Sequence, residues 1–73
     1  MLTLNCVGLL CPVPIYLAAQ RLGKLPAGTP LEVASDDEAI LQDMPSWCRL
    51  TGHAIVTYRC EGACHYYVVQ KPV

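Results

Sequence analysis

The stretch VGLLCPVPIY, residues 7–16, joins a strand-like pattern to a helix-like pattern. Before it, LTLNC (residues 2–6) alternates apolar and polar residues, as a half-buried strand does. After it, apolar residues recur at helical spacing as far as KLPAG (residues 24–28), whose proline and glycine favour a helix stop. The stretch therefore predicts a strand, a short loop that holds Cys11, and a helix that begins at Pro12.

The rest of the chain continues this alternation of strands and helices. TPLEVAS (29–35) predicts a second strand, and DDEAILQDMPSWCRLTG (36–52) predicts a second helix. HAIVTYRC (53–60) and CHYYVVQK (64–71) predict a hairpin around EGA. Without a linker or a repeat, we expect a single domain over residues 1–73. We expect an α/β (α+β) two-layer sandwich of order β-α-β-α-β-β, with two helices on one face of a four-stranded mixed sheet.

The second helix carries its own boundary signals. Asp36 or Asp37 is expected to cap its start, and Gly52 is expected to end it. Pro45 lies in the middle and predicts either a kink or a restart capped by Asp43.

The two prolines that follow Cys11 suggest a chemical role for its sulfur. With Pro12 at the first helical position, Cys11 becomes the N-cap and Pro14, the third helical residue, has no N–H to offer. The N–H of Val13 is then expected to point toward the sulfur. A helix N-terminus favours an anion and lowers the pKa of a cysteine below about 8.5. We therefore expect a rigid support for a reactive thiolate, approached through the flexible segment that contains Gly8 and Leu9. The alternative is a small hydrophobic residue at a tight turn.

Composition excludes several classes of function. The chain has a formal net charge of -1, with five Lys plus Arg against six Asp plus Glu, so it lacks the basic surface that nucleic-acid binding needs. It contains no apolar run long enough to span a membrane and no signal peptide, which predicts a cytoplasmic protein without membrane insertion. At 53% hydrophobic residues, so short a chain is expected to expose apolar surface to a partner.

The hairpin cysteines permit several readings. If Cys60 and Cys64 flank the turn symmetrically, they approach disulfide distance, and we rank reduced thiols first, a redox pair second and a metal site third. We predict no metal, because Cys60, Cys64 and His65 leave a fourth zinc ligand missing. The same register places an apolar set on one sheet face: Val56, Tyr58, Tyr66 and Val68. A second set, Ile55, Thr57, Tyr67 and Val69, is expected on the other face.

Two further side chains are assigned structural roles. Cys48, beside Trp47 on the second helix, is expected to pack in the core. His53 follows Gly52 and is expected to cap the helix or to pair locally.

The opening LNCVGLLCPVP resembles that of the TusA/SirA-like sulfur-carrier family, which has Gly-Leu, one residue, then Cys-Pro-x-Pro. The matching residues are Gly8, Leu9, Cys11, Pro12 and Pro14. The likeness continues in LPAGTPLEV, in SDDEAILQDMPSWCRLTGH and in the final YYVVQK. In the second of these segments the family-like positions are Asp36, Asp43, Pro45, Trp47, Cys48, Gly52 and His53.

This resemblance implies both a fold and an activity. The implied fold is that of the C-terminal domain of bacterial translation initiation factor three. The implied activity is a sulfurtransferase-type carrier that holds sulfur as a persulfide on Cys11, without a cofactor and without acid-base groups of its own. The implied partners are a cysteine desulfurase or rhodanese as donor, and a sulfur-relay protein or transporter as acceptor. A monomer or a weak homodimer is expected.

The sequence departs from the family pattern at a few positions. Asn5 stands where the family often has Asp, and Cys6, Cys60 and Cys64 are additions to the common pattern. Cys6 is a candidate resolving thiol that attacks a persulfide on Cys11, although a strand-end cysteine without a redox role is the simpler reading. The alternative function is a non-catalytic, redox-sensitive interaction module that uses the apolar hairpin face together with Cys60 and Cys64.

Overall fold

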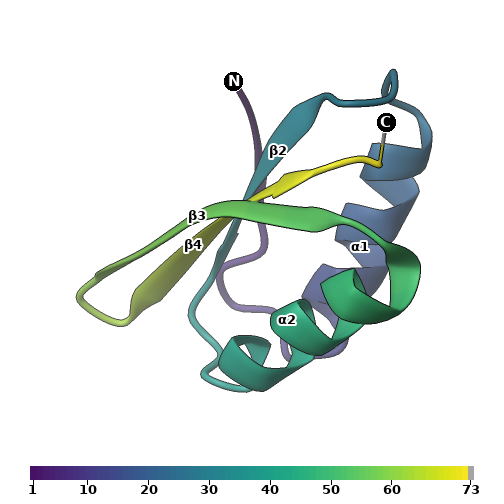
Figure 1. Ribbon diagram of the computed structural model, residues 1–73. Coiled ribbons are helices and arrows are strands. Elements are labelled where there is room, and N and C mark those ends of the chain that lie inside the picture. The colour runs from purple at the N-terminus through teal and green to yellow at the C-terminus, as the bar shows by residue number, and fades with distance from the viewer. Residues whose placement is uncertain (73) are drawn as a thin grey trace.

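The protein consists of six regular elements in the predicted order, traced in Figure 1. The computed structural model describes residues 1–72. The elements are β1 (Leu2–Asn5), α1 (Val13–Gly23), β2 (Pro30–Ser35), α2 (Ile40–Thr51), β3 (Ala54–Glu61) and β4 (Cys64–Gln70). Over the described residues, neither helix has the length and apolar character needed to cross a membrane.

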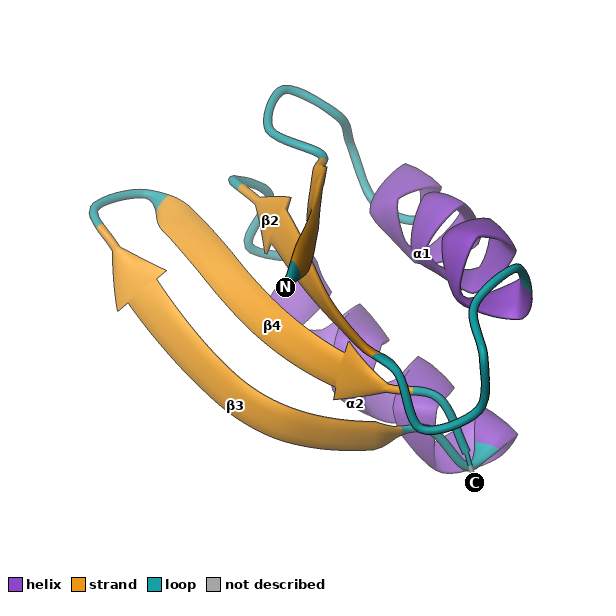
Figure 2. Cartoon of the chain, turned by 90° about the horizontal axis from the view of Figure 1, so that it is seen from above, coloured by secondary structure: helices purple, strands orange, loops and turns teal. Residues whose placement is uncertain are grey.

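The four strands form one mixed sheet in the spatial order β1-β2-β4-β3. β1 is parallel to β2, whereas β4 is antiparallel to both β2 and β3. Both helices pack on the same face of the sheet (Figure 2). The predicted two-layer sandwich is confirmed. Because β1 and β2 are parallel, the segments that follow them, residues 6–12 and 36–39, leave the same end of the sheet.

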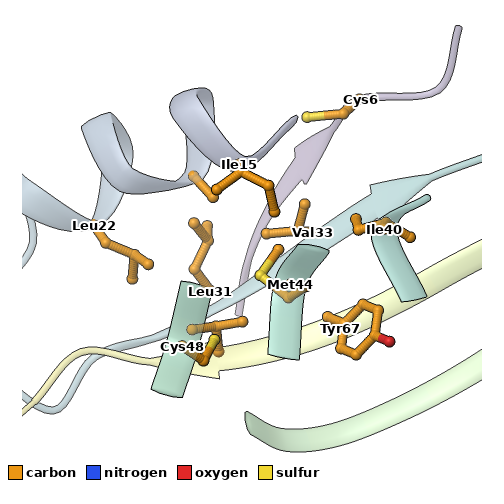
Figure 3. Packing of buried hydrophobic residues seen from close by; sticks show 11 residues of the cluster. Cys6, Ile15, Leu22, Leu31, Val33, Ile40, Met44, Cys48 and Tyr67 are labelled. Carbon is orange, nitrogen blue, oxygen red and sulfur yellow. The ribbon is translucent and has the colours of Figure 1, made fainter. Parts of the chain in front are cut away.

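The core lies between the helices and the sheet (Figure 3). Leu31 and Val33 alternate along β2 as predicted, and both are fully buried. The other members of the cluster are Cys6, Ile15, Ala18, Leu22, Ile40, Met44, Cys48, Tyr67 and Val69. Burial of a side chain the size of Leu or Met contributes about 1.5–3 kcal/mol, so this cluster is what holds the helices on the sheet.

Helix α2 begins later than predicted and is not restarted within its length. Its N-cap is Ala39, and Asp37 instead accepts a hydrogen bond from the Ala39 N–H in the preceding turn. The helix runs continuously through Pro45, so a restart capped by Asp43 was a wrong prediction. Because Pro45 has no N–H, the carbonyl of Leu41 lacks its intrahelical donor. Leu41 is exposed, so water can donate a hydrogen bond to this carbonyl instead. Gly52 ends the helix in a left-handed conformation, as predicted, with φ of 80°.

The predicted hairpin register was wrong by one residue. Tyr58 pairs with Tyr67 and Cys60 pairs with His65, because the turn contains only Gly62 and Ala63 between the strand ends. A register shift between Ile55 and Thr57 marks a bulge in β3. A shift of one residue moves each side chain of one strand to the opposite face relative to its partner.

The apolar hairpin face expected from the sequence therefore does not exist as one surface. Tyr58 lies on the helix-covered face, where its ring lies 4.8 Å from that of Tyr67 in the core cluster. Tyr66 lies on the opposite face beneath the guanidinium of Arg59, 3.9 Å from its carbon to the ring centre. Arg59 also pairs with Glu61 at 2.8 Å and with Glu32 at 3.5 Å. Around Tyr66, this open face therefore carries a charged cluster of Arg59, Glu61 and Glu32.

Candidate functional site

The loop between β1 and α1, residues 6–12, presents Cys11 at one end of the sheet. The N–H of Cys6 donates to the carbonyl of Ala34 at 2.7 Å, which extends the pairing of β1 with β2 by one residue. The chain then turns, with the N–H of Leu9 donating to the carbonyl of Cys6 at 3.1 Å. Gly8 has φ of 87°, a left-handed conformation that favours glycine at this turn.

Two consecutive carboxylates from the neighbouring β2–α2 segment hold this loop. Asp36 Oδ1 accepts a hydrogen bond from the Gly8 N–H at 2.9 Å, and Asp37 Oδ2 accepts one from the Cys11 N–H at 2.8 Å. We call Asp36 and Asp37 the acidic clamp. The sequence pattern identified both residues as candidate helix caps, and Asp36 also as a family-like position, but it did not predict their contact with the Cys11 loop. Their position directly after β2 could have predicted this contact. Parallel neighbouring strands end at the same edge of the sheet, so the loops that follow β1 and β2 lie side by side.

The structure corrects the predicted role of Cys11 as helix N-cap. Pro12 is the N-cap, and its carbonyl accepts from Tyr16 at 3.2 Å. The Val13 N–H donates to the carbonyl of Leu10 at 3.0 Å and is not free to bind the sulfur. Pro14 is the second helical residue and is fully buried, so it anchors the helix start in the core. The prolines therefore shape the junction without providing donors to the thiol.

The environment of the Cys11 sulfur also differs from the expectation of a lowered pKa. Cys11 is partly buried against the core, and this burial is the main cause that raises the pKa of its thiol to about 11. The negative charges of Asp37 and Asp43 and the neighbouring Cys6 raise the pKa further. The prediction of a low-pKa thiolate was wrong, because it counted the helix end and neither the burial of the thiol nor the carboxylates of Asp37 and Asp43.

Comparison with known proteins was consistent at the level of sequence and fold. The family model described as sulfurtransferase TusA matches residues 2–71. The chain belongs to the TusA family. A sulfur carrier protein TusA from Pseudomonas savastanoi pv. phaseolicola is 37% identical over 70 residues, covering 94% of this chain and 83% of that protein. A second, from Pseudomonas syringae pv. syringae, is 35% identical over 68 residues, covering 93% and 81%.

A solved structure extends the comparison to the fold. The SirA-like protein from Desulfitobacterium hafniense superposes with a TM-score of 0.85 over 100% of both chains, at 21% sequence identity. The SirA-like fold expected from the resemblance is therefore confirmed.

The cysteines other than Cys11 in this TusA-family chain occupy different environments. Cys6 is fully buried, and burial raises the pKa of its thiol. These two features favour a packing role over that of a resolving thiol. Cys48 is buried on α2 in the core cluster, as predicted.

Cys60 and Cys64 do not form the symmetric pair on which the redox hypothesis depended. Cys60 pairs across the hairpin with His65 and Cys64 pairs with Glu61, so the two cysteines point to opposite faces of the sheet. The structure adds a contact that the sequence pattern did not identify: the Tyr58 hydroxyl and Nδ1 of the buried His65 are 2.8 Å apart.

His53 pairs locally, as predicted. Its Nδ1 lies 2.7 Å from the hydroxyl of Thr51, and its ring stacks on Trp47 with 4.4 Å between centres. Burial lowers the pKa of His53, and the positive charge of Lys71 adds to this effect. These contacts give it a role at the end of α2, away from the acidic clamp.

Proposed function

We propose that this protein carries sulfane sulfur as a persulfide on Cys11 and passes it from a donor to an acceptor in a sulfur relay. The observation that carries the proposal is the setting of Cys11 in a chain of the TusA family. Cys11 is partly buried, in a loop that two carboxylates hold and whose neighbouring residues include exposed apolar side chains.

The transfer chemistry needs only a sulfur nucleophile on this chain. The thiolate of Cys11 attacks the terminal sulfur of a donor persulfide, so a new S–S bond forms to Cys11 as the donor S–S bond breaks. The bonding electron pair leaves with the donor sulfur as a thiolate, and the terminal SH group is now on Cys11. In the second step an acceptor nucleophile attacks that outer sulfur, and the Cys11 thiolate leaves. Neither step needs an external oxidant or reductant.

Exposed apolar side chains near Cys11 support protein partners over a small-molecule substrate. Leu10 is 75% exposed, Val7 49%, Val13 41% and Leu9 37%. Apolar side chains grouped in this way are typical of a contact surface. We propose a cysteine desulfurase or a rhodanese as the donor, and a sulfur-relay protein or transporter as the acceptor.

The test is intact-mass spectrometry after incubation with a persulfide-loaded cysteine desulfurase, in the absence of reductant. We expect the wild type to gain the mass of one sulfur atom, and reductant to remove it. Cys11→Ser should not gain sulfur, whereas Cys60→Ser, which removes a more exposed thiol, should gain as much as the wild type. Equal gain in Cys11→Ser, or loss of the gain in Cys60→Ser, would contradict the proposal.

A further inference from the structure

We propose that Asp37 is a positioning residue for Cys11: its carboxylate fixes the backbone of Cys11 and places a negative charge beside the Cys11 thiol, which slows the reaction of that thiol with electrophiles in the free protein. This inference rests on the proposed role of Cys11 as the carrier residue. It assigns to the acidic clamp a part in controlling when that sulfur becomes a nucleophile.

The carboxylate of Asp37 is held in place at both oxygens. Oδ2 accepts from the Cys11 N–H at 2.8 Å and Oδ1 accepts from the Ala39 N–H at 3.0 Å. The backbone N–H of Asp37 donates to the hydroxyl of Ser35 at 3.2 Å, and Ser35 is fully buried at the end of β2. Hydrogen bonds from Ala39 and Cys11 lower the pKa of Asp37, so the group that touches the Cys11 backbone is an anion.

The charged and titratable groups that act on the Cys11 sulfur come from three elements. Asp37 comes from the β2–α2 segment, Asp43 from α2, and Cys6 from the end of β1. Helix α1 begins with VPIY, so its first turn brings no charged side chain to offset the two carboxylates. A like charge near a titrating acid disfavours its ionised form, and this acts in the same direction as the partial burial of Cys11.

This arrangement has consequences for both steps of a sulfur relay. A protonated thiol is a poor nucleophile, so the free protein is slow to react with electrophiles it meets by chance. Once sulfur is bound, a high-pKa thiol is also a slow leaving group, which favours retention of the persulfide. A donor or acceptor that works on Cys11 then has to supply either a general base or a cation beside Asp37.

The matched variants are Asp37→Asn and Asp36→Asn. Each removes one negative charge from the acidic clamp, while the amide oxygen of asparagine can still accept the loop N–H. Of the two residues, only Asp37 is among the charges that act on the Cys11 sulfur. The measurement is the rate at which iodoacetamide modifies Cys11 at pH 8, followed by mass spectrometry of the Cys11 peptide. This rate measures the reactivity of the thiol whether or not the protein functions as a sulfur carrier. The proposal about Asp37 can therefore be refuted independently of the proposed function.

We expect Asp37→Asn to react roughly 1.5- to 2-fold faster than the wild type at pH 8. The Asp37 charge is one of several causes that raise the thiol pKa from 9.0 to about 11, and burial is the largest of them. Removing the charge should therefore lower the pKa by about half a unit, which gives about threefold more thiolate, of which about 1.7-fold is lost to weaker intrinsic nucleophilicity. Asp36→Asn should react at the wild-type rate. An unchanged rate in Asp37→Asn, or an equal rise in Asp36→Asn, would overturn the proposal.

A second measurement does not depend on a variant that folds. In about 1 M KCl the screening length falls to about 3 Å, which weakens the effect of the Asp37 charge. Since iodoacetamide is uncharged, the wild-type rate should rise with salt at fixed pH through the thiol alone. A wild-type rate that does not change with salt would overturn the electrostatic part of the proposal.

Discussion

The buried thiol of Cys48 predicts a loss of stability at alkaline pH that a single substitution should remove. Burial raises the pKa of this thiol from 9.0 to about 11 in the folded protein. Folding therefore favours the protonated form. The corresponding stability is fully present below pH 9.0 and is lost as the pH rises through about 11.

The size of the effect follows from the pKa difference. Each pKa unit corresponds to about 1.4 kcal/mol of stability. The loss begins at the pKa of the unfolded state, so at pH 10, about one pH unit above it, about 1.4 kcal/mol would be lost. Allowing for solvent relaxation around the ion, the wild type should lose roughly 1 kcal/mol at pH 10 through Cys48 alone. Cys48→Ala cannot lose this contribution. At pH 7 the same variant should be less stable than the wild type by about 1 kcal/mol, because it removes a packed sulfur atom from the core.

The measurement is urea unfolding of the wild type and Cys48→Ala at pH 7, 9 and 10 with a phosphine reductant present. The variant should start less stable at pH 7 and become about as stable as the wild type at pH 10. Other groups that titrate in this range are common to both proteins and largely cancel in the difference. A stability difference that stays the same at all three pH values would refute the reasoning.

Three further predictions follow from the backbone, the hairpin and the core. Gly52→Ala should lower the stability to urea by about 1 kcal/mol, because φ of 80° is unfavourable for alanine. The matched substitution Gly23→Ala, in a helix with open space around it, should be neutral or stabilising by up to about 1 kcal/mol. Oxidation should give no intramolecular Cys60–Cys64 disulfide in non-reducing peptide mapping, and finding one in the folded protein would contradict the observed register. Leu31→Ala should cost about 2–5 kcal/mol by urea unfolding, and a loss below about 1 kcal/mol would mean that this fully buried side chain is not part of a packed core.

The sequence predicted an element correctly wherever the preference of nearby residues agreed with the packing of the folded chain. The alternation of Leu31 and Val33 placed β2 correctly, because one face of that strand is buried. The position of Gly52 predicted the end of α2, because a left-handed residue is a local requirement that glycine meets best. The spacing around Cys11 identified the family motif without resolving its geometry.

The sequence-based predictions were wrong where contacts between residues far apart in the sequence outweighed the preferences of nearby residues. Asp37 is a good helix cap in isolation, but here its carboxylate binds the N–H of Cys11, which lies 26 positions away. The hairpin register depends on a two-residue turn and a bulge in β3, which composition alone does not specify. A one-residue error there separated Tyr58 from Tyr66 and Cys60 from Cys64.

By itself, the sequence determined the order of six elements, the two-layer architecture and membership of the TusA family, because apolar periodicity and short motifs are local properties. The tertiary structure alone decided the chemistry around Cys11. Parallel pairing of β1 and β2 brings the acidic clamp to the Cys11 loop, and packing of α2 adds Asp43. Burial of the thiol raises its pKa, and because charge acts through space, the carboxylates that the fold brings near the sulfur raise it further.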